Sequence, residues 1–132
     1  MFWSSNEYLN LCQELSELGF NPELSSGGRV ARGFADLGFE EYLYLPPNNL
    51  VSLFTGDKSI LPDEHRHFFF AVPSVDEMVN FAIAKGAKIK QLDFENQRTW
   101  TLNVEFSSQN YLFQDDDINL TIGKFLLTIL KQ

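Results

Sequence analysis

The sequence predicts an α+β fold built from two related halves. Two observations carry this prediction: two helices open with the same capping signature, and each half contains a hairpin signal. The chain has 132 residues, of which 44% are hydrophobic and 14% aromatic. That composition supports one folded domain with a buried core. In both halves the pattern reads as a helix followed by three strands.

Both helices are predicted from a serine cap with a glutamate three residues later. Residues 4–7, Ser-Ser-Asn-Glu, open the first helix, whose apolar residues recur at helical spacing until Gly19 ends it. Residues 74–77, Ser-Val-Asp-Glu, open the second helix, which ends at Gly86. The return of one signature in both halves predicts an internal repeat.

Three strands are predicted after each helix, and the last two are joined by a four-residue polar turn. The first-half strands are residues 29–35, 41–45 and 50–54, and the second-half strands are residues 88–94, 102–106 and 111–113. A further strand, residues 67–72, precedes the second helix. Its unbroken Phe and Val character predicts burial on both faces.

These elements define one domain over residues 1–132 with four parts. They are module one at 4–54, a connector at 55–64, module two at 65–114 and a C-terminal tail at 115–132. The connector contains Gly, Pro and Asp, which favour turns. The apolar part of the tail, from residue 118 onward, fits either a strand pair or a closing helix.

Residues 67–72 (His-Phe-Phe-Phe-Ala-Val), followed by 74–78 (Ser-Val-Asp-Glu-Met) and 85–89 (Lys-Gly-Ala-Lys-Ile), carry a family resemblance. This passage resembles the vicinal oxygen chelate superfamily, which includes glyoxalase I and the bleomycin resistance proteins. Residues 15–20, Leu-Ser-Glu-Leu-Gly-Phe, are similar to the end of that family's first helix. The similarity covers about residues 4–114.

The resemblance implies two βαβββ-type modules, the first lacking its N-terminal strand. Such modules form cupped mixed sheets with helices on the outside. Only three residues precede the first predicted helix, too few for an opening strand. We therefore expect residues 124–130 of the tail to supply that strand, by circular permutation or by exchange with a partner subunit.

In the metal enzymes of this superfamily, each module supplies one ligand from its first strand and one glutamate from its last. His67 matches the first-strand histidine of module two, whereas Ser52 and Phe113 stand at the two carboxylate positions. We therefore predict no metal and no cofactor. His65 and His67 lie on one face of an extended segment, so they remain weak candidates for a local metal site.

Alternation along residues 100–106 separates an apolar face from a polar face. The polar residues are Thr101, Asn103 and Glu105, and their counterparts in the first half are Glu40, Tyr42 and Tyr44. The resemblance implies that all six face the concave side of the sheets and bind a ligand together with His67. Two tyrosines and two carboxylates suit a cationic or aromatic compound. The alternative is an ordinary exposed sheet face.

The preferred interpretation is a metal-independent protein that sequesters a small molecule, as bleomycin-resistance-type proteins do, with no catalytic residue. The resemblance also implies a homodimer. One alternative is a metal-dependent lyase or isomerase of the glyoxalase fold. Another is an acidic interaction or inhibitor protein that blocks a basic partner.

Charge and hydropathy narrow the classes of partner and the location. The formal net charge of -8 opposes nucleic-acid binding, because phosphate backbones are repelled. No stretch reaches the length of a membrane-spanning helix, so we expect a cytoplasmic protein.

The single cysteine, Cys12, lies on the apolar side of the first helix, where a thiol behaves as a small hydrophobic group.

Overall fold

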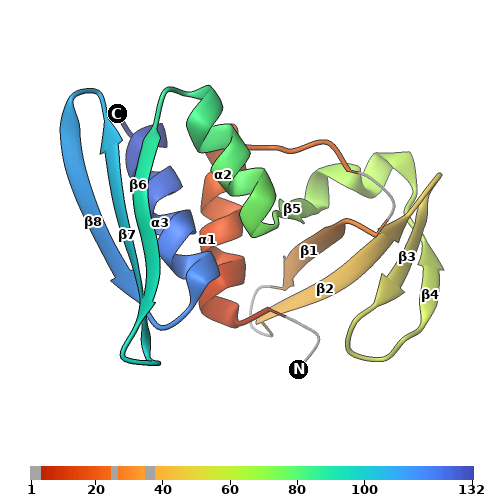
Figure 1. Ribbon diagram of the computed structural model, residues 1–132. Coiled ribbons are helices and arrows are strands. Elements are labelled where there is room, and N and C mark those ends of the chain that lie inside the picture. The colour runs from red at the N-terminus through yellow and green to blue at the C-terminus, as the bar shows by residue number, and fades with distance from the viewer. Residues whose placement is uncertain (1–3, 25–26, 35–37) are drawn as a thin grey trace. The chain divides into compact units, whose positions relative to one another are not determined.

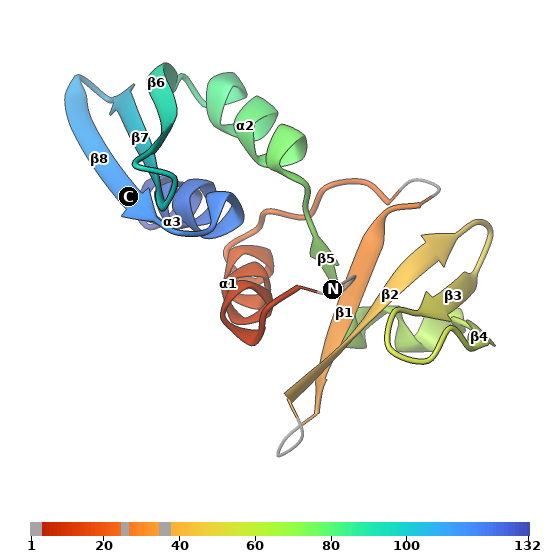
Figure 2. The same cartoon turned by 60° about the horizontal axis from the view of Figure 1, so that its bottom comes forward.

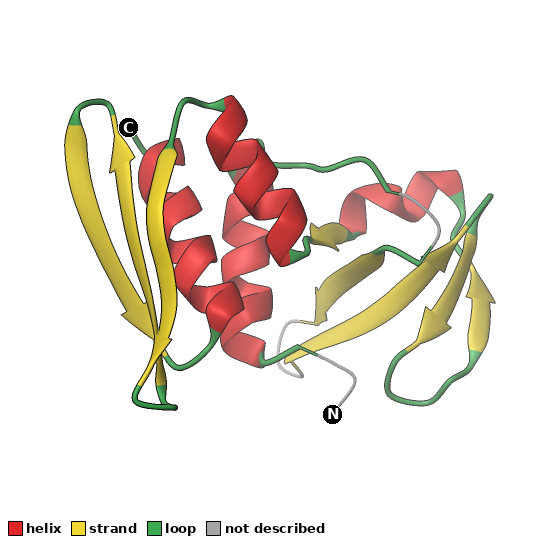
Figure 3. Cartoon of the chain, viewed as in Figure 1, coloured by secondary structure: helices red, strands yellow, loops and turns green. Residues whose placement is uncertain are grey.

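The computed structural model describes residues 4–24, 27–34 and 38–132 (Figure 1). The chain has an α+β fold, as predicted, and it divides into two compact units, Met1–Pro73 and Ser74–Gln132. In each unit a helix precedes a set of antiparallel strands (Figure 3). The predicted order of a helix followed by three strands is therefore confirmed in both halves.

The described part of the first unit contains an α-helix, a 3-10 helix and a five-stranded sheet. The elements are α1 (Asn6–Glu17), β1 (Arg29–Phe34), β2 (Gly38–Leu45), β3 (Asn49–Ser52), β4 (Lys58–Ile60), η1 (Asp63–Phe68) and β5 (Phe70–Val72). The sheet has the order β4-β3-β2-β1-β5, and every pairing in it is antiparallel.

Helix α1 begins one residue later than the sequence predicts. Ser5 is the cap, because its side chain accepts a hydrogen bond from the Tyr8 amide at 3.2 Å. The helix ends before Gly19, whose φ of +101° favours glycine. Tyr8 is buried, and its hydroxyl donates to the Pro73 carbonyl at 2.7 Å. This bond ties α1 to the residue that follows β5.

One core cluster of the first unit lies on one face of its sheet. The buried residues of this cluster are Val30, Tyr44, Leu50 and Leu61, and the half-buried Leu24, Tyr42 and Phe69 pack against them. Val30 is paired with Tyr42 across β1 and β2, and Tyr44 with Leu50 across β2 and β3. Paired residues share a face of the sheet, so the segment 61–69 covers this face.

The strand predicted at residues 67–72 is shorter than expected and pairs elsewhere. Residues 63–68 form η1, and only Phe70–Val72 is a strand. The missed signal was Pro62 followed by the acidic Asp63 and Glu64, which is typical of a helix start. Strand β5 pairs with β1 of the first unit. The prediction that this strand opens module two is therefore wrong, and so is its burial on both faces, because Ala71 is only half-buried.

The second unit consists of two helices and a three-stranded antiparallel sheet. Its elements are α2 (Val75–Ala84), β6 (Lys88–Glu95), β7 (Thr99–Phe106), β8 (Gln109–Asp115) and α3 (Ile118–Leu130). The strand order is β6-β7-β8. The predicted capping box is present at α2, where Ser74 and Glu77 bond to each other's backbone amides at 3.1 Å.

Two predictions for the second half change, and so does one for the sheets of both units. The hairpin between β7 and β8 turns on two residues, Ser107 and Ser108, both with positive φ, as a type I′ turn requires. The tail is the helix α3, which packs on β7 and β8 (Figure 2), so residues 124–130 do not supply a strand. The described sheets are antiparallel rather than mixed.

Helix α3 is stabilised at its start by two acidic residues. The Asp117 side chain accepts a hydrogen bond from the Asn119 amide at 2.7 Å and so caps the helix. Asp115 accepts a hydrogen bond from Lys124 Nζ, also at 2.7 Å.

Among the described residues, every helix falls short of the length and hydropathy that a membrane span requires.

Candidate functional site

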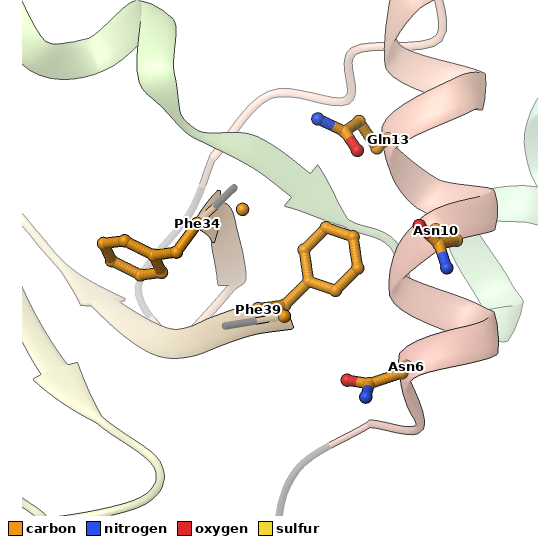
Figure 4. Close-up of a pocket in the computed structure, with 7 residues that line it drawn as sticks. Asn6, Asn10, Gln13, Phe34 and Phe39 are labelled. Carbon is orange, nitrogen blue, oxygen red and sulfur yellow. The ribbon is translucent and has the colours of Figure 1, made fainter. Parts of the chain in front are cut away.

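A pocket of about 480 Å³ opens within the first unit between α1 and the hairpin formed by β1 and β2 (Figure 4). We call it the α1–hairpin pocket. The described residues that line it are Asn6, Asn10, Gln13, Gly33, Phe34, Gly38 and Phe39. This volume lies in the range of small-molecule sites in proteins.

The helix contributes a row of three side-chain amides to this pocket. Asn6, Asn10 and Gln13 follow one another at steps of four and three residues, which places them on one side of a helix. Asn6 and Gln13 extend from α1 toward the side of the hairpin that carries Phe39, and Asn10 lies between them on the helix (Figure 4). Each amide offers two N–H donors and one carbonyl acceptor and carries no charge. The helical wall of the pocket can therefore both donate and accept hydrogen bonds.

The wall of the pocket formed by β1 and β2 is open because it contains two glycines, which have no side chain. A Cβ on Gly33 would lie 3.3 Å from Cε1 of Phe39, and a Cβ on Gly38 would lie 3.8 Å from Nδ2 of Asn6. Gly38 also has φ +81°, which favours glycine. The phenyl ring of Phe39 makes an edge-to-face contact with Phe70, with 5.8 Å between the centroids. This contact holds one aromatic surface in place.

The predicted ligand-binding residues of the first half lie on the other face of the sheet. Tyr44 is 7% exposed and its hydroxyl donates to the Pro47 carbonyl at 2.6 Å, so it belongs to the core. Tyr42 is half-buried, and its ring lies 5.7 Å from that of Phe69. The expectation that Tyr44 lines a ligand site is therefore wrong.

A cation of the chain itself occupies the aromatic surface of this face. The guanidinium carbon of Arg32 lies 4.7 Å from the ring centroid of Phe34, 5.4 Å from that of Phe68 and 5.7 Å from that of Phe69. Contacts of this kind stabilise a cation. The Arg32 Nε atom is buried and has no hydrogen-bond partner among the described residues. A cationic ligand on this face would have to displace Arg32.

Glu40 takes part in the polar contacts beside this cluster. Burial raises the pKa of Tyr42 above its ordinary value, and the hydrogen bond and charge of Glu40 raise it further, while Arg32 acts in the opposite direction. Ser52 donates to Glu40 Oε1 at 3.4 Å, and the Ser52 hydroxyl accepts from the amides of residues 54 and 55 at 3.2 Å. Ser52 thus stabilises the turn after β3.

The two histidines lie in η1, so the expectation that they share one face of an extended segment is wrong. The rings of His65 and His67 pack on Phe68, with centroids 5.8 Å and 4.0 Å away. Over residues 4–24, 27–34 and 38–132, no three His, Cys, Asp or Glu side chains gather in a way that could hold a metal ion.

The predicted residues of the second half lie on β7 as expected. Leu102 and Val104 are fully buried, whereas Thr101, Asn103 and Glu105 are half-buried on the opposite face. Their partners on β8 are Gln114, Leu112 and Asn110, and on β6 they are Asp93, Gln91 and Lys88. The alternation is confirmed. A site shared with Glu40 and Tyr42 stays a prediction, because the two sets belong to different units.

Phe113 stands at the second predicted carboxylate position. It is half-buried on β8, and its ring lies 5.8 Å from that of Phe125 in α3. Phe113 therefore takes part in the packing between sheet and helix.

Glu41 is a buried carboxylate that the sequence pattern did not single out. It is 0% exposed, and its oxygens accept hydrogen bonds from the Ser4 amide at 2.6 Å and the Ser4 hydroxyl at 3.0 Å. Arg29 lies 3.6 Å away and is half-exposed. Ser4 directly precedes the cap of α1, so the hydrogen bonds of Glu41 connect the start of this helix to β2. A negative charge near a helix N-terminus is also favourable.

We expect Cys12 to resist thiol reagents in the folded protein. Its side chain is 1% exposed, and burial, together with the charge of Glu41, raises the thiol pKa from 9.0 to about 12. Only the thiolate reacts, so the reaction with a disulfide reagent at pH 8 should be roughly 1,000-fold slower than in urea-unfolded protein. Equal rates in the two states would contradict the burial of Cys12.

Comparison with family models, curated proteins and solved structures found no match for this chain.

Proposed function

We propose that this chain is a metal-independent protein that binds a small uncharged heteroaromatic molecule in the α1–hairpin pocket. The observation that supports this most directly is the row of Asn6, Asn10 and Gln13 beside the ring of Phe39 (Figure 4). The row supplies hydrogen bonds, and the ring supplies an aromatic surface.

The chemistry of the lining narrows the class of ligand. Side-chain amides match a molecular edge that carries both donors and acceptors, and a phenyl ring pairs favourably with another flat ring. The described lining contains no charged side chain, and the net charge of -8 opposes a phosphate group. A nucleoside-like heterocycle therefore fits better than a nucleotide. The cationic ligand expected from Glu40 and Tyr42 fits less well, because Arg32 already occupies that surface.

Sequestration without a reaction, and a homodimer, are implied by the resemblance and belong to the same proposal. Sedimentation equilibrium tests the dimer: a mass of twice the chain supports it, and a single-chain mass across the working concentration range removes it.

Replacing Asn10 with leucine should abolish most of the binding. We expect uridine, cytidine, adenosine or guanosine to shift the side-chain NH₂ signals of Asn10 and Gln13 in a ¹⁵N NMR titration. Asn10→Leu should weaken this binding by at least about tenfold, because a buried ligand edge then loses its hydrogen-bond partner. Asn10 is exposed and leucine favours helices, so the fold should persist.

Asn80→Leu is the matched control, because Asn80 is an exposed asparagine within α2. Its binding curve should overlay that of the unmodified protein. The proposal fails if both variants lose affinity equally, if none of the four nucleosides binds, or if the shifts appear away from residues 6–13 and 33–39. Shifts at this pocket with glucose but not with nucleosides would also contradict it.

A further inference from the structure

A second pocket of about 150 Å³ lies in the first unit, on the core face of the sheet. Its walls come from the segment after α1, from β1, from the segment 61–69 and from β5. The apolar residues that form it include Leu24, Val30, Leu61, Phe69 and Ala71. The polar lining residues are Asn21 and Arg66. We call this the β5 pocket.

The size and walls of the β5 pocket suit a benzene-sized apolar group. An engineered protein cavity of about 150 Å³ lined by Leu, Ile and Phe stays dry and binds benzene. Val30 and Leu61 are 1% and 2% exposed, so this end of the pocket is shielded from water. Removing an apolar group from water at such a surface is favourable.

Arg66 gives the pocket its charge. Its Nε donates to Asp63 Oδ1 at 3.1 Å, and its Nη2 donates to the Pro47 carbonyl at 3.4 Å and to the Asn48 side chain. These bonds hold the guanidinium beside the turn between β2 and β3. The Arg66 side chain is 42% exposed and that of Asp63 is 82% exposed. An exposed pair of this kind contributes little to stability, so a ligand carboxylate can compete for the same guanidinium.

Asn21 adds a second donor. Its side-chain oxygen accepts a hydrogen bond from the Ser16 hydroxyl at 2.7 Å, and its Nδ2 lies 3.5 Å from the Ser16 carbonyl. The second contact fixes which end of the amide is the NH₂ group, because the Ser16 carbonyl can only accept a hydrogen bond. That group carries two hydrogens, so at least one remains for a ligand.

We infer that the β5 pocket binds a small monocarboxylate with a benzene-sized apolar group, with the carboxylate on Arg66 and the apolar group among Leu24, Leu61 and Phe69. This site is separate from the α1–hairpin pocket, and the two share none of the lining residues that the structure describes. Guanidinium–carboxylate hydrogen bonds are about twice as strong as neutral ones, which selects an acid over its amide.

Benzoate and benzamide test the inference, since they share a ring and differ in charge. In ¹⁵N NMR titrations at 150 mM salt, benzoate should shift the amide signals of residues 21, 23, 24, 61 and 69–71. Benzamide should bind at least about tenfold more weakly. Equal binding of the two, no binding of benzoate, or shifts confined to other residues would overturn the inference.

Two variants locate the contacts. Arg66→Gln should weaken benzoate by at least about tenfold and leave benzamide unchanged, whereas Arg98→Gln, at an exposed arginine of the turn between β6 and β7, should change neither. Ala71→Leu fills the pocket and should abolish both. If Arg66→Gln does not fold, Ala71→Leu and the comparison of benzoate with benzamide still test whether the β5 pocket binds a carboxylate. Asn10→Leu should weaken nucleoside binding and leave benzoate binding intact. The two proposals can therefore fail independently of each other.

Discussion

Phe125→Ala is expected to lower the free energy of unfolding of the second unit by about 3–5 kcal/mol, the usual cost of removing a buried aromatic ring. Phe125 in α3 is 0% exposed. Its ring lies 6.5 Å from that of Phe106, 6.4 Å from Tyr111 and 5.8 Å from Phe113. The variant therefore loses the contact between α3 and the sheet, and it leaves a cavity. Urea titration, followed by the NMR amide signals of β7, measures the loss.

Phe94→Ala is the matched control for this measurement, because it also removes a phenyl ring from the second unit. Phe94 is 48% exposed, and its ring centroid lies 5.0 Å from that of Trp100. We expect a loss of about 1 kcal/mol, within the usual range for one exposed aromatic pair. Equal losses in the two variants would contradict the packing of α3 on β7 and β8.

Glu41→Ala is expected to lower the free energy of unfolding of the first unit by about 2–4 kcal/mol. The substitution leaves the amide and hydroxyl of Ser4 without their acceptor. A hydrogen bond to a charged group contributes about 1.5–3 kcal/mol, and because Ser4 is only half-buried, water replaces part of the two lost bonds. Arg29 is 42% exposed at its side chain, so water takes over its charge and the lost ion pair adds little. Urea titration followed by the amide signals of β2 gives the value.

Two further variants separate charge from hydrogen bonding at this position. Glu41→Gln keeps one acceptor oxygen for Ser4 and removes the charge, so its loss should fall between those of the parent and Glu41→Ala. Glu23→Ala, at an exposed glutamate of the same unit, should change stability by less than about 0.5 kcal/mol. A Glu41→Ala protein as stable as the Glu23→Ala protein would show that the buried carboxylate does not hold α1 to the sheet.

The α1–hairpin pocket shows which part of a binding site a sequence pattern can predict. The spacing of Asn6, Asn10 and Gln13 places three amides on one side of a helix, and this signal was available before the structure. What faces that side was not available, because Gly33 and Phe39 belong to strands whose position depends on sheet pairing. The polar side of α1 thus became a candidate site only when the hairpin was placed beside it.

The residues predicted to bind a ligand show the opposite case. Glu40, Tyr42 and Tyr44, the counterparts of the alternating Thr101, Asn103 and Glu105, were predicted to share a face, and the register of β2 confirms it. The segment 61–69 covers that face of the sheet. It buries Tyr44 and places the rings of Phe68 and Phe69 beside Arg32. Alternation reports which side chains point the same way, and it carries no information about what lies above them.

The sequence by itself determined the elements whose causes lie within a few residues: the cap at Ser74, the helix stops at Gly19 and Gly86, and the two-sided pattern of β7. Caps, left-handed glycines and strand alternation are short-range effects, so a local window contains them. Only the tertiary structure decided that β5 pairs with β1, that the tail is a helix on β7 and β8, and that Glu41 is buried beneath α1. Each of these depends on partners distant in the chain, and burial against those partners selects among conformations that the local sequence allows about equally.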